Sequence, residues 1–160
     1  MFQNKKIVII YSGDYYITSD PDVVICTVLG SCIAVCLYDE KLRIGGMNHF
    51  MLPRAWEQQD FESGRFGLES MEIMLAKFYK MGVNHANIKA KVFGGARMLE
   101  IPMRPGATDR EQDVPSANIN FILDYLKEKQ ITIMAHDLGG TSGRKIYYVL
   151  ENNKVYLHRL

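Results

Sequence analysis

Two apolar runs joined by a short charged segment limit what this chain can fold into more than any other feature of its sequence. Residues 32–38, Cys-Ile-Ala-Val-Cys-Leu-Tyr, carry no charge, and residues 43–51 form a second run rich in apolar side chains. Between them lies Asp39-Glu40-Lys41-Leu42, which is charged at its centre. Two such runs separated by a polar turn predict a β-hairpin.

The register of this hairpin decides which side chains meet. If Glu40 and Lys41 are the two loop residues, Cys32 falls directly opposite His49. Side chains paired in this way have Cβ atoms about 4.5–5.5 Å apart on one face of the sheet. The adjacent glycines at positions 45 and 46 invite a bulge, which would shift the pairing by one residue. Without a bulge, the spacing places a thiol within reach of an imidazole.

Strand-like and helix-like apolar patterns alternate along the rest of the chain. We expect strands at residues 7–11, 23–28, 88–93 and 131–135, a helix at 67–81 ended by Gly82, a second helix capped by Ser116, and a last hairpin of residues 145–150 and 154–160 around Asn152-Asn153. Residues 54–65 and 103–114 are expected to be loops. The fold class that follows is α/β, a sandwich with mixed β-sheets flanked by two or three helices, in a single domain over residues 1–160.

Composition excludes several classes of protein. A formal net charge of +1 disfavours nucleic-acid binding, although a local basic cluster is compatible with a neutral total, and no apolar stretch approaches the roughly 20 residues of a membrane helix. The apolar run at residues 7–10 is too short for a secretion signal. Three cysteines, an odd number, lie within eleven positions, which is typical of a reduced chain. We therefore expect a cytoplasmic protein with free thiols.

Cys32 and His49 are the residues best placed for chemistry. A thiol beside an imidazole is the minimum equipment for catalysis by a cysteine nucleophile. The preceding residues, Gly30 and Ser31, are small, so a substrate carbonyl could approach the backbone amides there and have its oxyanion stabilised. The alternative is structural, because free cysteine is among the most buried residue types and a single histidine is often a hydrogen-bonded core residue. For Cys26 and Cys36 we expect that structural role.

Other patterns give weaker signals. The cysteines are six and four positions apart and the four histidines are scattered, which disfavours a zinc site. The glycine pairs at 94–95 and 139–140 lack the lysine and serine that end a phosphate-binding loop. We expect these pairs to form tight turns where chain segments approach closely.

Several segments, taken together, resemble the CheD chemotaxis proteins. The matching segments are residues 27–39 (Thr-Val-Leu-Gly-Ser-Cys-Ile-Ala-Val-Cys-Leu-Tyr-Asp), 45–53 (Gly-Gly-Met-Asn-His-Phe-Met-Leu-Pro) and 91–96 (Lys-Val-Phe-Gly-Gly-Ala), then Asn118 and residues 137–140 (Asp-Leu-Gly-Gly). The resemblance covers nearly the whole chain, in order and with similar spacing. The Leu-Gly-Ser-Cys and His-Phe-Met-Leu-Pro segments are its most specific parts.

The resemblance implies a single CheD-like deamidase domain acting on methyl-accepting chemotaxis receptors, where such enzymes convert selected glutamine side chains to glutamate. It assigns the nucleophile to Cys32 and the base to His49, and it implies no metal or organic cofactor. The family's third catalytic residue is a threonine upstream of the cysteine. In some members it lies at the position of Cys26; here Thr27 is one residue closer, and we predict Thr27 for this role, with a backbone carbonyl as the alternative.

Two other functions are compatible with the resemblance. One is a regulatory module that binds a CheC-type phosphatase and raises its activity, which requires an exposed surface rather than a reactive Cys32. The other is hydrolysis of receptor glutamyl methyl esters by the same cysteine and histidine. Intact Cys32 and His49 favour an enzyme over an adaptor. Residues 54–65 are a candidate for substrate recognition by their position alone.

Overall fold

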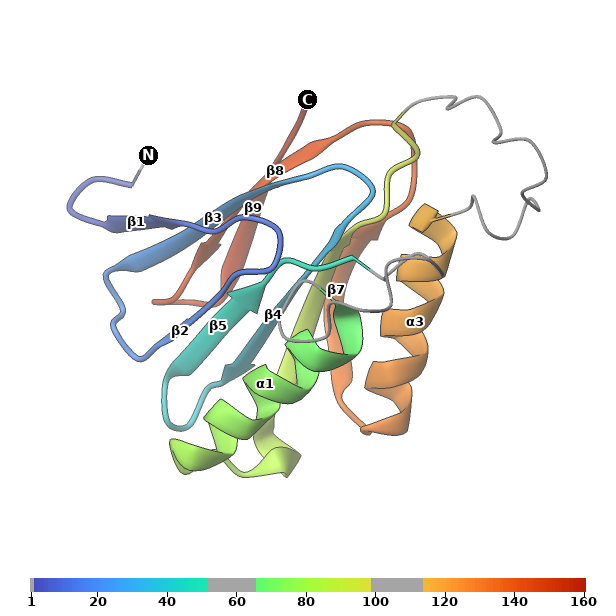
Figure 1. Ribbon diagram of the computed structural model, residues 1–160. Coiled ribbons are helices and arrows are strands. Elements are labelled where there is room, and N and C mark those ends of the chain that lie inside the picture. Colours follow the sequence, from blue (N-terminus) through green and yellow to red (C-terminus); the bar gives the residue numbers. More distant parts are fainter. Residues whose placement is uncertain (1, 52–65, 99–113) are drawn as a thin grey trace.

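Two β-sheets stack face to face, and two helices cover the outer side of one of them (Figure 1). This computed structural model describes residues 2–51, 66–98 and 114–160. One sheet has the strand order β1-β3-β8-β9 and the other β2-β5-β4-β6-β7. The elements are β1 (Lys6–Ile9), β2 (Tyr15–Thr18), β3 (Val23–Leu29), β4 (Ile33–Asp39), β5 (Ile44–Asn48), α1 (Gly67–Lys80), η1 (His85–Asn87), β6 (Lys89–Gly94), α3 (Val114–Glu128), β7 (Thr132–Leu138), β8 (Arg144–Val149) and β9 (Lys154–Arg159).

Strand β4 shows why the sandwich forms. Every one of its residues is buried, because it lies in the middle of its sheet with a covered surface on each side. Side chains alternate between the two faces of a strand. Ile33, Val35 and Leu37 pack in the core beneath the helices, while Ala34 and Cys36 pack in the core between the two sheets.

The predicted fold class is confirmed: the sheets are mixed, and helices α1 and α3 flank the five-stranded sheet. Gly82 follows α1 with φ of +89°, as expected of a residue that ends a helix. The prediction that Ser116 caps the second helix is wrong, because α3 already begins at Val114. Strand β2 was not predicted, since its four residues at the edge of the sheet are too few to show a pattern. The predicted loop at 54–65, and residues 103–113 of the other, lie outside the described residues.

The predicted direct pairing of Cys32 with His49 is wrong by two positions. The hairpin of β4 and β5 pairs Ile33 with Phe50 and continues in that register to its turn. A shift of two keeps every side chain on its expected face, whereas a shift of one would have reversed all of them. Cys32 and His49 are therefore diagonal rather than direct neighbours, and both remain on the side that faces the other sheet.

The cause of the shift is the turn, not the glycines. The loop has four residues, 40–43, closed by the pair Asp39 and Ile44. The carboxylate of Asp39 accepts a hydrogen bond of 2.8 Å from the Lys41 amide, and Arg43 takes a left-handed conformation with φ of +55°. The register of β4 against β5 runs evenly through both glycines, so the bulge that they invited does not form.

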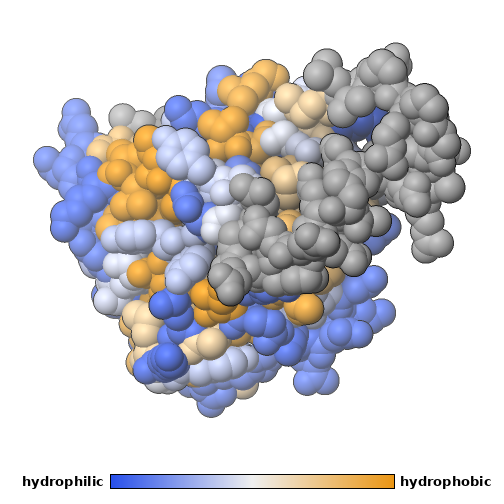
Figure 2. All heavy atoms as spheres, viewed as in Figure 1, coloured by the Kyte–Doolittle hydropathy of each residue, from blue (hydrophilic) through white to orange (hydrophobic). Residues whose placement is uncertain are grey.

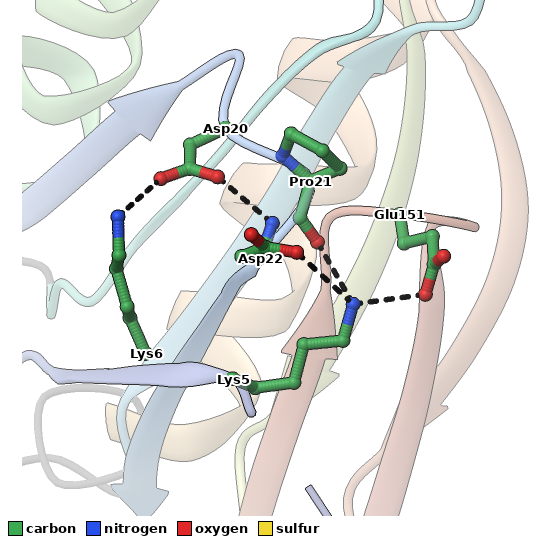
Figure 3. A network of polar contacts seen from close by, with 6 residues as sticks. All are labelled: Lys5, Lys6, Asp20, Pro21, Asp22 and Glu151. Atoms are coloured by element: carbon green, nitrogen blue, oxygen red, sulfur yellow. Dashed lines mark hydrogen bonds and ion pairs between the residues drawn. The ribbon is translucent and has the colours of Figure 1, made fainter. Parts of the chain in front are cut away.

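A polar network fixes the start of β1 at the end of the sandwich away from Cys32 (Figure 3). The Lys5 ammonium donates to the Pro21 carbonyl at 3.2 Å and to the Glu151 carboxylate at 2.9 Å, and Lys6 donates to Asp20 at 2.9 Å. These contacts are largely exposed, so each adds little to stability. Together they hold β1 in parallel register with β3. The register matters because the turn that follows β1 reaches His49.

Candidate active site

Cys32 lies where the chain crosses from one sheet to the other, in the link between β3 and β4. The three carbonyls of this link are all held. Gly30 accepts from the Ala96 amide, Ser31 from the Asn118 side chain and Cys32 from the Gly95 amide, each at 2.9 Å. Within the described residues, no acceptor takes the backbone N–H of Ser31 or of Cys32. In this part of the structure, two backbone donors beside the thiol, the amides of Ser31 and Cys32, thus have no acceptor.

The close approach expected at residues 94–95 is confirmed. Gly94 has φ of +119°, and a Cβ there would collide with the carbonyl oxygen of Cys32. Gly95 has φ of +71°, and a Cβ there would collide with Ile119. The second glycine pair differs. Gly139 and Gly140 have positive φ but nothing within 4 Å of a Cβ, so only their backbone conformation calls for glycine.

His49 is clamped by the turn that follows β1. The Gly13 amide donates to the His49 carbonyl at 2.8 Å, and the His49 amide donates to the Asp14 carbonyl at 3.1 Å. In Figure 1 this turn lies beside the end of β5. The histidine is only 6% exposed. The backbone of His49 is therefore held on both its amide and its carbonyl side by the turn between β1 and β2.

Asn48 points to the face of the sheet opposite to His49. Its side-chain oxygen accepts from the Val35 amide at 2.9 Å, and its side-chain nitrogen contacts the Met71 sulfur at 3.3 Å in the core beneath α1. The amide of Val35 thus bonds a side chain where a regular ladder would supply a backbone carbonyl. Strand β5 ends at this point, and His49 follows it.

Thr27 on β3 contacts the imidazole of His49 from the other sheet. Its hydroxyl donates to the Ile10 carbonyl at 2.8 Å and lies 2.8 Å from Nδ1 of His49. A hydroxyl has one proton, so a hydroxyl that donates to Ile10 must accept from His49. Nδ1 therefore carries the imidazole proton, and Nε2 has a free lone pair. This is the tautomer that a general base needs.

Burial keeps both reactive groups neutral. Burial lowers the pKa of His49 from 6.5 to about 4, with the Asp14 carboxylate acting weakly in the other direction. Burial raises the pKa of the Cys32 thiol above its ordinary value, and a hydrogen bond with the Ser12 hydroxyl opposes that rise. The resting site is thus a neutral thiol and a neutral imidazole. Within the described residues no hydrogen bond joins the two directly.

Ser12 is the site residue that sequence reasoning missed. It lies in the turn that holds the backbone of His49, and its hydroxyl acts to lower the pKa of the Cys32 thiol. Ser12-Gly13-Asp14 only marked the end of an apolar run, so no spacing linked it to Cys32. Exposed apolar side chains flank this region: Tyr11, next to Ser12, is 68% exposed, and Met98 packs against Gly30. On the face seen in Figure 2, hydrophobic patches lie between hydrophilic side chains.

Cys26, Cys36 and Asp137 lie in environments that indicate a structural role. Cys26 and Cys36 are buried and free, as expected, and burial raises the pKa of each thiol. Asp137 accepts hydrogen bonds from Arg144 and Arg159, both at 2.6 Å. In the described part of the chain, no cluster of three or more histidine, cysteine or acidic side chains could hold a metal ion. There, too, no helix is long and apolar enough to span a membrane.

Comparison with known proteins gives a consistent result. A family model described as CheD chemotactic sensory transduction matches residues 51–159. A protein of Ruegeria sp. named probable chemoreceptor glutamine deamidase CheD 1 is 39% identical over 92% of this chain and 74% of its own length. A protein of Shewanella oneidensis with the same name is 39% identical over 98% of this chain and 73% of its own length.

A third relative, from Ralstonia nicotianae, is named probable chemoreceptor glutamine deamidase CheD and is 35% identical over 98% of this chain and 65% of its own length. Among solved structures, YlmD from Geobacillus stearothermophilus aligns with a TM-score of 0.38 and 8% identity, over 83% of this chain and 60% of that one. A likeness at that level does not bear on the fold.

Proposed function

The chain belongs to the CheD family, and we propose that it is a protein-glutamine deamidase that converts selected glutamine side chains of methyl-accepting chemoreceptors to glutamate. The observation that carries this proposal is the hydrogen bond between Thr27 and His49, which leaves Nε2 of the imidazole free to take a proton at the edge where Cys32 lies. The names of the relatives support the substrate class.

The proposed reaction has two steps. In the first, Nε2 of His49 takes the proton of the Cys32 thiol as the sulfur attacks the carboxamide carbon of the glutamine. The carbonyl oxygen becomes an oxyanion, which the free amides of Ser31 and Cys32 are placed to stabilise. The protonated His49 then gives its proton to the departing nitrogen. The carbon–nitrogen bond breaks, ammonia leaves, and a thioester remains.

In the second step His49 activates a water molecule, which attacks the thioester carbon. The carbon–sulfur bond breaks, Cys32 regains a proton from His49, and the side chain is released as glutamate. Because both groups start neutral, the thiol proton has to pass to His49 for the sulfur to react. Thr27 keeps the imidazole in one tautomer throughout and stabilises the imidazolium that forms in each step.

Two further proposals concern the compartment and a partner. We propose that the chain acts in the cytoplasm on the receptors' cytoplasmic part, and that it also binds a CheC-type phosphatase. Phosphatase binding does not need a reactive thiol, so Cys32→Ala should leave it intact. Hydrolysis of glutamyl methyl esters would use the same groups but release methanol instead of ammonia.

The test of the proposed function is intact-mass analysis of a chemoreceptor cytoplasmic fragment incubated with this protein. Conversion of an amide to an acid adds about 1 Da for each glutamine. We expect that gain with the wild-type protein and none with Cys32→Ala. The matched control is Cys26→Ala, which removes a buried thiol on β3, the strand that precedes Cys32, and should retain the activity. An unchanged fragment mass with the wild-type protein would refute the proposal.

A further inference from the structure

One fully buried polar side chain of helix α3 contacts the link between β3 and β4, which contains Cys32. Asn118 is 0% exposed, and its side-chain nitrogen donates to the Ser31 carbonyl at 2.9 Å. The other two carbonyls of the link, those of Gly30 and Cys32, accept from backbone amides of the segment that follows β6. The Ser31 carbonyl is therefore the one of the three that a side chain holds, and the one whose support a substitution can remove.

Because a peptide bond is planar, the hydrogen bond from Asn118 to the Ser31 carbonyl also fixes the direction of the Cys32 N–H. The Ser31 carbonyl and the Cys32 N–H belong to one planar trans peptide, so they point in opposite directions. A carbonyl directed at α3 directs the Cys32 N–H away from α3. Helix α3 packs on the outer face of its sheet, whereas the Cys32 side chain packs in the core between the sheets. The N–H of Cys32 is thus turned toward the side on which its own thiol lies.

We propose that Asn118 is a positioning residue that aims the Cys32 backbone N–H at the oxyanion of the reacting glutamine. This inference rests on the proposed function. When the Cys32 sulfur attacks, the carbon–oxygen π bond of the amide breaks and its electron pair moves to the oxygen. The N–H of Cys32 donates a hydrogen bond to that oxygen and keeps its proton. Asn118 acts on the reaction through the Ser31–Cys32 peptide, whose carbonyl accepts its hydrogen bond.

The experiment compares Asn118→Leu, which has similar volume but no donor, with the wild-type protein. The control is Asn120→Leu, an exposed position on the same helix. Two quantities are measured: kcat and KM for deamidation of a receptor cytoplasmic fragment, and the rate constant for alkylation of Cys32 by iodoacetamide. Alkylation uses the thiol but forms no oxyanion. Cys26 and Cys36 are buried in the folded protein, so alkylation of these two thiols reports any misfolded fraction, for which kcat is then corrected.

We expect Asn118→Leu to lower kcat about 10- to 100-fold, since the oxyanion donor is misdirected rather than deleted. KM and the alkylation rate constant should stay near the wild-type values, and Asn120→Leu should match the wild type in every quantity. An unchanged kcat would overturn the proposal. So would a parallel loss of kcat and alkylation, which would make the role structural. If Asn118→Leu does not fold, Asn118→Ala takes its place with the same criteria. Absence of deamidation by the wild-type protein would instead refute the proposed function.

Discussion

The Thr27 hydroxyl lies 2.8 Å from Nδ1 of His49 and donates its only proton in a hydrogen bond of 2.8 Å to the Ile10 carbonyl. The two contacts together fix the histidine tautomer. Thr27 lies on β3 and His49 follows β5, so this bond also ties the two sheets together at the edge where Cys32 lies. Orientation of the base is thereby built into the packing of the sandwich.

Thr27→Val should lower kcat about 10- to 100-fold with little change in KM. Valine fills the same volume but cannot hold Nδ1–H, so the ring loses both its tautomer and its orientation. Steady-state deamidation of a receptor fragment measures the effect. Thr27→Ser keeps the hydroxyl and should recover most of the activity. Equal activity of the valine and serine variants would show that the hydroxyl has no part in catalysis.

Ser12→Ala should make Cys32 less reactive at neutral pH. The Ser12 hydrogen bond opposes the rise that burial causes in the thiol pKa, so its removal raises that pKa further. We expect alkylation by iodoacetamide to slow about two- to tenfold at pH 7, the effect of one hydrogen bond, and its pH profile to move to higher pH. Ser19→Ala, at another exposed serine, is the control. An unshifted profile would exclude Ser12 from the site.

Gly94→Ala should be far more harmful than Gly139→Ala. Both glycines have positive φ, so each substitution costs about 1–2 kcal/mol through backbone strain. Only at Gly94 does the added Cβ also collide with the Cys32 carbonyl. We expect Gly94→Ala to lose about 3 kcal/mol or more of unfolding free energy, together with its activity. Urea denaturation of both variants measures the difference, and similar losses would contradict the geometry.

Acid should destabilise the protein through His49. Its pKa is about 4 when folded, against 6.5 for the ordinary side chain. Below pH 6.5 the unfolded chain therefore binds a proton that the folded one does not, and stability falls until pH reaches about 4. The loss over this interval is about 3 kcal/mol. Denaturation at several pH values should show it in the wild-type protein and a shallower loss in His49→Gln. Identical pH dependence in the two proteins would refute the assignment.

The hairpin pattern predicted the right strands and the right face for Cys32 and His49, because both depend on alternation along the chain. It missed the register, since the length of the loop depends on two local details: the side chain of Asp39 bonding the Lys41 amide, and the left-handed conformation of Arg43. Because the register differed by an even number of residues, Cys32 and His49 stayed on the same face of the sheet, as the predicted catalytic pair requires. A register error of one residue would have placed His49 on the opposite face of the sheet from Cys32.

Contacts made by distant segments could not be predicted in this way. Thr27 was assigned from family resemblance, and nothing in its spacing indicated that it would meet His49 from the opposite sheet. Ser12 was missed because a turn after a short parallel strand reaches the thiol only once the sandwich is assembled. Asn118 was noted as a match, but its bond to the Ser31 carbonyl depends on how α3 packs.

In the proposed mechanism, a thioester on Cys32 is the intermediate of deamidation. Its most direct test is to incubate the protein and a receptor cytoplasmic fragment with hydroxylamine, which attacks thioesters. We expect fragment species heavier by about 16 Da, the mass change from amide to hydroxamate, with the wild-type protein and none with Cys32→Ala. Deamidation that proceeds without any hydroxamate in the presence of excess hydroxylamine, or hydroxamate formed equally by Cys32→Ala, would contradict it.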